Sequence, residues 1–278
     1  SLHDALPISE YLFKYIQSPA IQDRISDMHT GSTNQVELSK TEIVQTKFPL
    51  PPLAEQRRIV AKLDSLFART QHARAEAHRS LSLIEHLEQA TLSKAFRGDL
   101  TFDWRDARGL TEEVGTRSKG SGGMNELPRG WAITELGNLL DRLQYGLTAK
   151  ADASASGTRF ARITDIEDFS IKWDAVPGVT NNTQNAKYRL RHGDFLFART
   201  GSIEKACRVE TPPDAVFASY LIRGHPVEED LSDWLCWYIR SQEYMSQIYD
   251  RASGIGRSNV NAQKLSTIEV PLAPLPEQ

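Results

Sequence analysis

The sequence lacks the short motifs by which many nucleotide-using and metal-using enzymes are recognised. No glycine is followed directly by lysine, which excludes a Walker A loop, and no Gly-x-Gly-x-x-Gly fingerprint for a dinucleotide occurs. No acidic residue stands two positions before a lysine, so the usual metal-dependent nuclease motif is absent, and so is an Asn-Pro-Pro-aromatic methylase motif. The chain is therefore predicted to have no catalytic residues and no cofactor, although it can be a non-catalytic piece of an enzyme.

Cysteine, clustered histidine and long apolar runs are scarce as well. Cys207 and Cys236 are too few for a disulfide framework, which favours a reducing cytoplasm. No apolar stretch is long enough to span a bilayer, so we expect a soluble protein without a membrane partner. His72, His78 and His86 lie on a charged helix without the spacing of metal ligands, and no metal site is expected.

Charge of neither sign dominates, and the formal net charge of −3 gives no indication of a nucleic-acid partner by itself. The distribution of charge is more informative. Residues 187–208 and 251–264 are rich in lysine and arginine, whereas residues 209–250 are acidic. Such segregation can create a basic face on a nearly neutral molecule, although an ordinary solvated surface explains the same pattern.

What the chain does contain is a long-range repeat. Residues Phe48–Gln56 return as Val270–Gln278, and residues Glu10–Ser18 match the pattern of Asp233–Ser241. The two copies lie more than 200 residues apart, which is too far for a solenoid. The repeat therefore predicts two similar domains, each followed by the same kind of connector.

The repeat also predicts that the sequence is a fragment. Residues 1–8 have no counterpart before the second copy and resemble the translation of a sequencing adapter, so we expect them to be a scar. After Pro52 the first copy continues into a long helix. Residues 275–278 set up the same helix start, and we expect them to be the truncated beginning of a second spacer helix.

The predicted fold class is α+β, with a mixed domain joined to a long helix of coiled-coil type and the tail of a second similar domain. The expected segments are a domain tail over 9–52, a spacer helix over 53–98, a flexible linker over 99–125 and a second domain over 126–274. The domain tail is expected to contain a helix around 9–27, a Gly-Ser-Thr-Asn turn and a strand or loop that leads into the prolines. In the second domain, the strand candidates are 131–136, 160–166, 194–199, 216–217 and 220–222, and helices cover 231–251.

Residues 53–97 form one predicted helix, about 65 Å long, that ends at Gly98 as its C-cap. Its apolar and small residues recur with heptad spacing, and the resulting seam consists of Ile59, Leu63, Leu66, Ala73, Ala77, Ile84 and Leu87. A narrow seam with small residues in its middle and charged flanks favours close pairing with another long helix. An ordinary core helix of a compact domain is the alternative.

These features together resemble the specificity subunit of type I restriction-modification systems. The residues that carry the resemblance are Leu127–Trp131, Leu190–Ile203, Ser219–Arg223, Gly254–Asn261 and the two Pro-Leu-x-Pro-Leu-x-Glu-Gln blocks. The resemblance implies two target recognition domains separated by two long helices that pair antiparallel. Each domain would read one half of a bipartite site in double-stranded DNA, and the helices would fix the gap and bind the methylation subunits, in a complex that also holds restriction subunits. Flipping of the target adenine would be the task of the partner that carries the cofactor.

The candidate DNA-binding residues lie in the basic stretches and in glycine-containing loops of the second domain. They are Tyr145, Lys150, Lys187, Arg191, Arg199, Ser202, Lys205, Arg257, Ser258 and Asn259. Arginine can pair with guanine and asparagine with adenine, while lysine and serine more often contact phosphates. Alternatively, Arg199 forms a structural ion pair with Asp194 or Glu204, and the glycine before Asp194 only shapes a turn.

Three functions remain open from the sequence. The leading one is a non-catalytic, sequence-specific DNA-binding subunit that directs methylation and restriction to one half-site. The second is the recognition region of a fused methylase-nuclease enzyme. The third is a coiled-coil scaffold without a nucleic-acid role, which absent or salt-insensitive duplex binding would favour.

Overall fold

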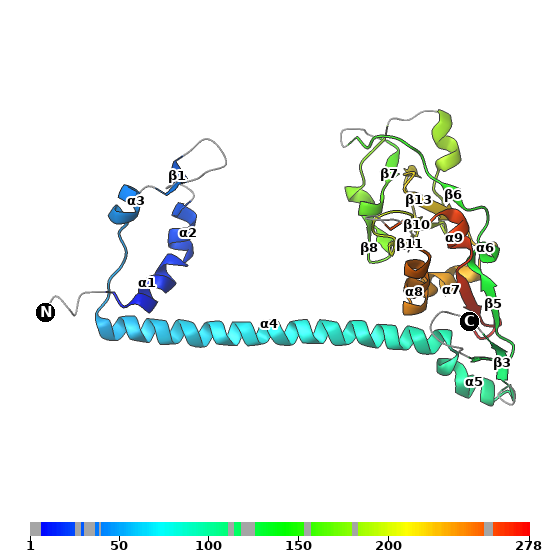
Figure 1. Cartoon of the computed structure of the whole chain (residues 1–278), viewed down its shortest axis with the longest axis horizontal. Coiled ribbons are helices and arrows are strands. Elements are labelled where there is room, and N and C mark those ends of the chain that lie inside the picture. Colours follow the sequence, from blue (N-terminus) through cyan, green and yellow to red (C-terminus); the bar gives the residue numbers. More distant parts are fainter. Residues whose placement is uncertain are drawn as a thin grey trace. The chain divides into compact units, whose positions relative to one another are not determined.

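The structure is a computed structural model that describes residues 7–25, 29–30, 37–38, 40–110, 114–117, 126–152, 157–179, 183–252 and 258–278. The chain divides into two compact units, residues 1–84 and 85–278. Helix α4 (Leu53–Phe96) begins in the first unit and ends in the second (Figure 1).

Around residues 9–27, where the sequence predicted one helix, the first unit holds two. Helix α1 (Ser9–Ile16) ends before Ser18, whose hydroxyl donates a hydrogen bond to the carbonyl of Tyr15 at 2.6 Å. Helix α2 (Pro19–Ile25) then begins on a proline, which needs no hydrogen-bond partner for its nitrogen in a first helical turn. The other elements are strands β1 (His29–Thr30) and β2 (Glu37–Leu38), which pair antiparallel, and helix α3 (Lys40–Gln45). The predicted turn over 31–34 lies outside the described residues.

The long helix is confirmed, with its end one residue from the predicted position. Helix α4 spans 44 residues, and the glycine that follows it at position 98 has φ +80°, the left-handed conformation expected of a C-cap. A side chain on Gly98 would collide with Pro128. In the second unit, the last turns of α4 join the core, because Phe96 is buried edge-on against Trp234 at 5.0 Å between ring centroids.

The predicted flexible linker is wrong for residues 99–110, which are folded. They form the turn η2 (Asp99–Thr101) and helix α5 (Phe102–Asp106), and strand β3 (Val114–Arg117) pairs with β4 (Glu126–Pro128). Arg105 explains why this segment is folded, because its side chain is buried and donates a hydrogen bond to the carbonyl of Gly98 at 2.7 Å. Composition did not reveal a buried arginine in a polar segment. Residues 118–125, which include the glycine-rich stretch, lie outside the described residues.

The second unit is a mixed α+β domain, as predicted. Its four-stranded antiparallel sheet has the order β11-β10-β13-β6, for which the bounds are Ala206–Arg208, Phe195–Ala198, Leu221–Gly224 and Gln144–Tyr145. Three further pairs are β5 (Ala132–Glu135) with β14 (Glu269–Leu272), the parallel pair β7 (Arg159–Ala161) with β12 (Ala215–Phe217), and β8 (Ile166–Glu167) with β9 (Ser170–Ile171). The helices are α6 (Leu136–Leu139), α7 (Leu231–Tyr238), α8 (Gln242–Arg251) and α9 (Ala262–Ser266), with short turns at η3 (Ile163–Asp165), η4 (Trp173–Ala175) and η5 (Thr183–Tyr188).

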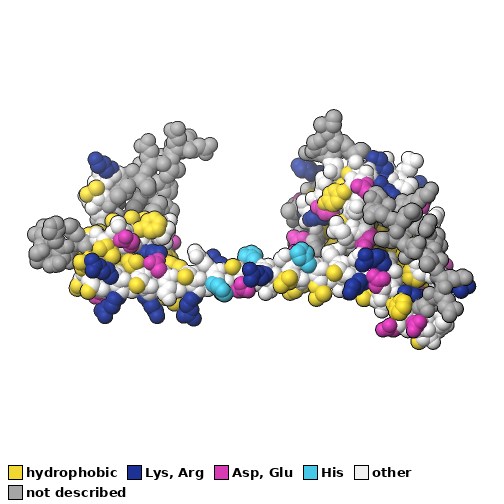
Figure 2. Space-filling view, turned by 60° about the horizontal axis from the view of Figure 1, so that its bottom comes forward, with side chains coloured by type: hydrophobic (Ala, Val, Ile, Leu, Met, Phe, Trp, Pro, Cys, Tyr) yellow, Lys and Arg dark blue, Asp and Glu magenta, His cyan; other side chains and the backbone are white. Residues whose placement is uncertain are grey.

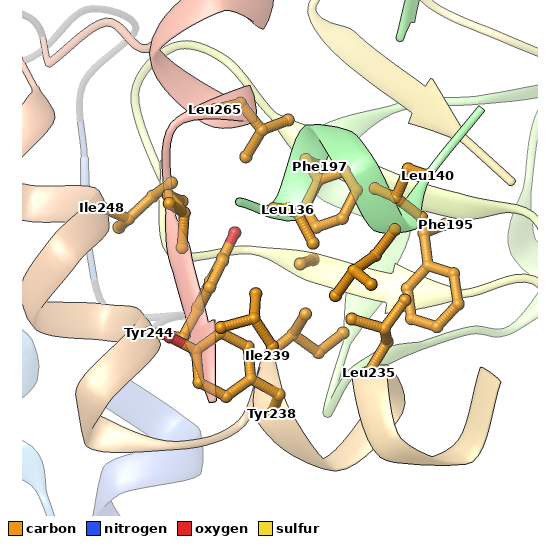
Figure 3. Packing of buried hydrophobic residues seen from close by; sticks show 14 of the residues in the cluster. Leu136, Leu140, Phe195, Phe197, Leu235, Tyr238, Ile239, Tyr244, Ile248 and Leu265 are labelled. Atoms are coloured by element: carbon orange, nitrogen blue, oxygen red, sulfur yellow. The ribbon is translucent and has the colours of Figure 1, made fainter. Parts of the chain in front are cut away.

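Strand β10 is apolar throughout because both of its faces are buried. Phe195 and Phe197 point to one face and pack among side chains of α6, α7 and α8 (Figure 3). Leu196 and Ala198 point to the opposite face and belong to a second cluster that includes Phe217 of β12. Since successive side chains of a strand alternate between faces, a strand buried on both sides has no polar alternation. This strand therefore forms the centre of the domain.

Equivalent hydrogen bonds confirm that the two sequence copies share one local structure. In the first copy the Tyr11 hydroxyl donates to the carbonyl of Pro49 at 3.0 Å, and in the second the indole N–H of Trp234 donates to the carbonyl of Pro271 at 2.9 Å. Ser241 matches Ser18, because its hydroxyl donates to a carbonyl three residues earlier at 2.7 Å. It also caps α8, and the helices predicted over 231–251 are α7 and α8.

The proline-rich blocks repeat as well. The side chain of Gln56 donates to the carbonyl of Pro51 at 2.9 Å, and that of Gln278 donates to the carbonyl of Ala273 at 2.6 Å. Both glutamines therefore close the same turn, five residues after its start.

The described residues contain no helix long and apolar enough to cross a membrane and no cluster of three or more potential metal ligands.

Candidate nucleic-acid interface

Several loops of the second domain meet beyond the end of β10. The carbonyl of Arg199 accepts a hydrogen bond from the backbone N–H of Val260 at 2.8 Å, and the N–H of Gly201 donates to the carbonyl of Ser258 at 3.2 Å. Thr200 and Asn259 form an isolated β-bridge. The predicted residues Arg199, Ser258 and Asn259 are therefore brought together, although they are about 60 residues apart in the sequence.

Tyr145 belongs to the same site. The guanidinium of Arg199 lies over its ring at 4.7 Å from the centroid, which is cation–π geometry. The Tyr145 hydroxyl accepts a hydrogen bond from the backbone N–H of Ala262, at the start of α9, at 2.9 Å. Among the described residues, the Nε of Arg199 is buried without a hydrogen-bond partner, and this side chain makes no ion pair with Asp194 or Glu204. The ring holds the guanidinium in place and leaves it donors for a ligand.

Asp194, by contrast, organises the turn that precedes β10. Its carboxylate is completely buried and accepts a hydrogen bond from the backbone N–H of Arg191 at 2.9 Å. Nδ1 of His225 lies 3.0 Å from the same carboxylate. Gly193 has φ +83°, so the glycine and aspartate do shape a turn. The guanidinium of Arg191 is itself paired with Asp141 at 3.3 Å and with Asp194 at 3.4 Å.

The remaining predicted residues are dispersed. Lys205 donates from its ammonium to the carbonyl of Ile166 at 2.8 Å and so holds the η3 turn. Lys187 is exposed, with its ammonium 4.9 Å from the ring centroid of Tyr188. Lys150 is exposed, and Ser202 is half-buried. Arg257 lies outside the described residues.

One arginine that we did not predict stands out. Arg162, directly after β7, donates from Nε to Oδ2 of Asp165 at 3.0 Å and from Nη2 to Oδ1 at 2.8 Å. This hydrogen bonding raises the pKa of the Arg162 guanidinium, which stays charged. The signal in the sequence was an arginine three residues before an aspartate, a spacing that is common on ordinary surfaces.

Arg162 lies on a cleft of about 500 Å³ beside the Arg199 loop. The cleft is lined by Leu147, Thr148, Ala149, Ala151, Phe160, Arg162, Ile163, Thr164, Thr200, Ala218, Ser219 and Tyr220. Gly146 allows the loop after β6 to approach β12 closely, because a side chain there would collide with the carbonyls of Phe217 and Ala218. Leu147 then exchanges backbone hydrogen bonds with the β12 end, donating to Phe217 at 2.8 Å and accepting from Ser219 at 2.9 Å.

Helix α4 carries a second candidate contact surface, the predicted seam. Ile59 and Leu63 are half-buried at the start of the helix. The later seam residues are exposed, and they are Leu66, Ala73, Ala77, Ile84 and Leu87. Leu87 is 68% exposed, which is unusual for leucine, and Figure 2 shows hydrophobic side chains on the surface of this helix.

Comparisons with known proteins agree with this architecture. A family model described as the type I restriction modification DNA specificity domain matches residues 3–77. The type I restriction enzyme EcoBI specificity subunit of Escherichia coli is 25% identical over 256 residues, which are 90% of this chain and 53% of that protein. The chain thus spans about half the length of the curated relative.

Two solved structures share the fold. A chain from a structural study of complex assembly and conformational transition in a type I R-M system has a TM-score of 0.60 and 21% identity, and the match covers 96% of this chain and 60% of that one. The HsdS subunit from Thermoanaerobacter tengcongensis has a TM-score of 0.51 and 22% identity, with 96% and 59% covered. The fold, the repeat and the sequence matches agree, and the chain is similar to the specificity subunits of type I restriction-modification systems.

Proposed function

We propose that this chain is a non-catalytic DNA-recognition component that directs a type I methylation and restriction complex to one half of a bipartite DNA site. The observation that carries the proposal is the convergence of Tyr145, Arg199, Ser258 and Asn259 at one edge of the second domain. Arginine and asparagine are the side chains best suited to read guanine and adenine edges. A preorganised arginine with unused donors supports recognition of bases in a groove.

Exposed lysines of the second domain supply the sequence-independent part of binding. Lys150 and Lys187 are exposed, and within the described chain neither ammonium forms an ion pair. By comparison, Arg189 is paired with Asp214, and Arg208 with Glu210 and Asp233. Free ammonium groups on the surface of the same domain are suited to phosphate contacts, which fix the orientation of the domain on the duplex. The basic stretch identified in the sequence is therefore divided between structural pairs and free charges.

The partners are methylation and restriction subunits, together with a second long helix that pairs with α4. The exposed part of the seam, ending at Leu87, supports helix pairing, because a 44-residue helix with an uncovered apolar row gains stability from a partner. A rigid helix pair keeps two DNA-binding domains at a fixed separation and so fixes the spacing between their half-sites on the DNA. One turn of B-DNA is about 34–36 Å long. The adenine to be methylated would be flipped into a partner subunit that carries the cofactor.

The test is duplex binding by the chain as a function of salt concentration. The logarithm of the affinity should fall linearly with the logarithm of the salt concentration, and the double variant Lys150→Ala with Lys187→Ala should reduce that slope by about 0.9 for each phosphate that the protein no longer neutralises. Arg79→Ala removes an exposed charge from α4, outside the second domain, and should keep the wild-type slope. Absent or salt-insensitive binding would contradict the proposal and favour a scaffold.

A further inference from the structure

Arg162 presents its guanidinium in a fixed orientation. The carboxylate of Asp165 accepts from Nε and from one hydrogen of Nη2, which is a side-on bidentate pair. The Asp165 side chain is only 8% exposed, whereas that of Arg162 is 40% exposed. Because one edge of the guanidinium is occupied, both hydrogens of Nη1 and the second hydrogen of Nη2 remain on its outer end. The aspartate therefore leaves an unused pair of donors on the part of the guanidinium that it does not contact.

The backbone that carries this pair is equally constrained. The N–H of Arg162 donates to the Asp165 carboxylate at 2.8 Å, and the N–H of Asp165 donates to the carbonyl of Arg162 at 3.0 Å. Lys205 holds the next carbonyls of the turn, those of Ile163 at 3.4 Å and Ile166 at 2.8 Å. Strand β7 anchors the other end through its parallel pairing with β12. A group positioned by this many contacts binds a ligand with little loss of conformational entropy.

The surroundings of Arg162 are suited to the edge and face of a base. None of the residues that line the cleft in the described part of the chain is acidic. Hydroxyls from Thr148, Thr200 and Ser219 line it together with apolar side chains, and Tyr220 is 61% exposed at the same cleft. The cleft thus offers a cationic donor pair, neighbouring hydroxyls and an aromatic ring, and no carboxylate among its lining residues competes for the donors. These groups favour binding of the electron-rich edge of a heteroaromatic base.

We propose that Arg162 is a specificity-determining residue that reads guanine in the major groove of the target duplex, with Asp165 as its positioning residue. Guanine presents two acceptors there, O6 and N7, and these match the outer donor pair of an arginine. The assignment rests on the proposed function, because it takes the same edge of the domain as the DNA-binding face. It adds the identity of one base that this face recognises.

The first experiment is a selection from a randomised duplex library with the full chain and with Arg162→Lys. The wild type should enrich guanine at one or more positions, and the variant should lose that preference by about 5- to 150-fold at one of them. Lysine keeps the positive charge but cannot present the two-pronged donor pair, so total binding and its salt dependence should change little. Asp165→Asn keeps the arginine but weakens its orientation, and it should reduce the same preference without altering others.

The second experiment changes the base as well as the protein. Replacing the selected guanine by 7-deazaguanine removes N7 and should weaken binding by the wild type, and this loss should be smaller in Arg162→Lys. Inosine at that position lacks only the minor-groove amino group and serves as the control, with affinity close to that of guanine. If the wild type binds duplexes and every guanine preference survives in Arg162→Lys, the inference is overturned while the proposed function stands. If the wild type binds no duplex at all, the proposed function fails first.

Discussion

At the scale of single residues, Asp194 is the most consequential side chain of the second domain. Its completely buried carboxylate holds the Arg191 N–H and faces His225. Asp194→Ala should lower the free energy of unfolding by about 3 kcal/mol, because it leaves buried donors without a partner. Urea unfolding measures this loss. The control is Asp233→Ala, at an aspartate whose side chain is 84% exposed, and it should cost less than about 0.5 kcal/mol. Equal losses would show that the turn does not depend on its carboxylate.

The two cysteines should differ in reactivity. Burial raises the pKa of Cys207 to about 12, far above its ordinary value, so its thiolate is almost absent near neutral pH. Cys236 is only half-buried. A thiol-reactive chromophore at pH 8 should therefore label one cysteine in the folded protein and two after unfolding. Cys236→Ser should abolish the fast reaction, and rapid labelling of this variant would contradict the burial of Cys207.

The candidate site could be predicted in part at this scale. Tyr145, Arg199, Ser258 and Asn259 were among the candidates chosen by residue type from three separate loops, and the structure brings these four together. Their role in DNA binding stays a prediction. Arg162 was missed because an arginine three residues before an aspartate is common on ordinary surfaces, and the cleft beside it depends on strands far apart in the sequence.

At the scale of elements, one buried carboxylate joins the segment after α4 to the end of the second domain. Glu277 accepts hydrogen bonds from the Thr101 hydroxyl at 2.6 Å and from the Trp131 indole at 2.8 Å, and it pairs with Arg105. These three donors come from η2, α5 and the approach to β5. This arrangement fixes residues that composition alone assigned to a linker.

The repeat provides a matched test of this contact. Glu277→Ala should destabilise the second unit by about 3 kcal/mol, because it leaves the buried guanidinium of Arg105 unpaired. Glu55 occupies the same position of the first copy and is exposed, so Glu55→Ala should change stability by less than about 0.5 kcal/mol. Thermal unfolding of both variants makes the comparison. Similar effects would show that the carboxylate has no special role at position 277.

Element boundaries were harder to predict than element types. The breaks at Ser18 and Ser241 arise from a serine hydroxyl that satisfies a carbonyl, and an amphipathic pattern continues across such a break. Burial differs between the copies as well, since Ile239 is fully buried and the corresponding Ile16 is 44% exposed. Periodicity shows which face of a helix is apolar, but it does not show what covers that face.

At the scale of the whole molecule, the exposed seam of α4 leads to a prediction about stability. Joining a second copy of residues 53–98 through a flexible linker should raise both helicity and the melting temperature, because the added helix covers residues such as Ile84 and Leu87. The control carries Ile84→Asn and Leu87→Asn in the added helix only and should lose most of the gain. Unchanged melting of the extended chain would rule out pairing through this seam.

The overall organisation was the part most accessible from the sequence. The repeated segments predicted two similar domain ends, and Tyr11 and Trp234 make equivalent hydrogen bonds in the two copies. The long helix was equally predictable, since its pattern is local. Sheet order and the cleft were not, because they depend on pairings between distant strands, such as β7 with β12.

The equivalence of the two proline-rich blocks has a consequence for inheritance. Gln56 and Gln278 close their turns with the same hydrogen bond, so a genetic crossover between the two blocks would leave that junction intact. The protein encoded by a recombinant gene would thus carry a different domain next to an unchanged proline-rich block. Under the proposed function, a single crossover at this junction would change the DNA target by exchanging a whole domain.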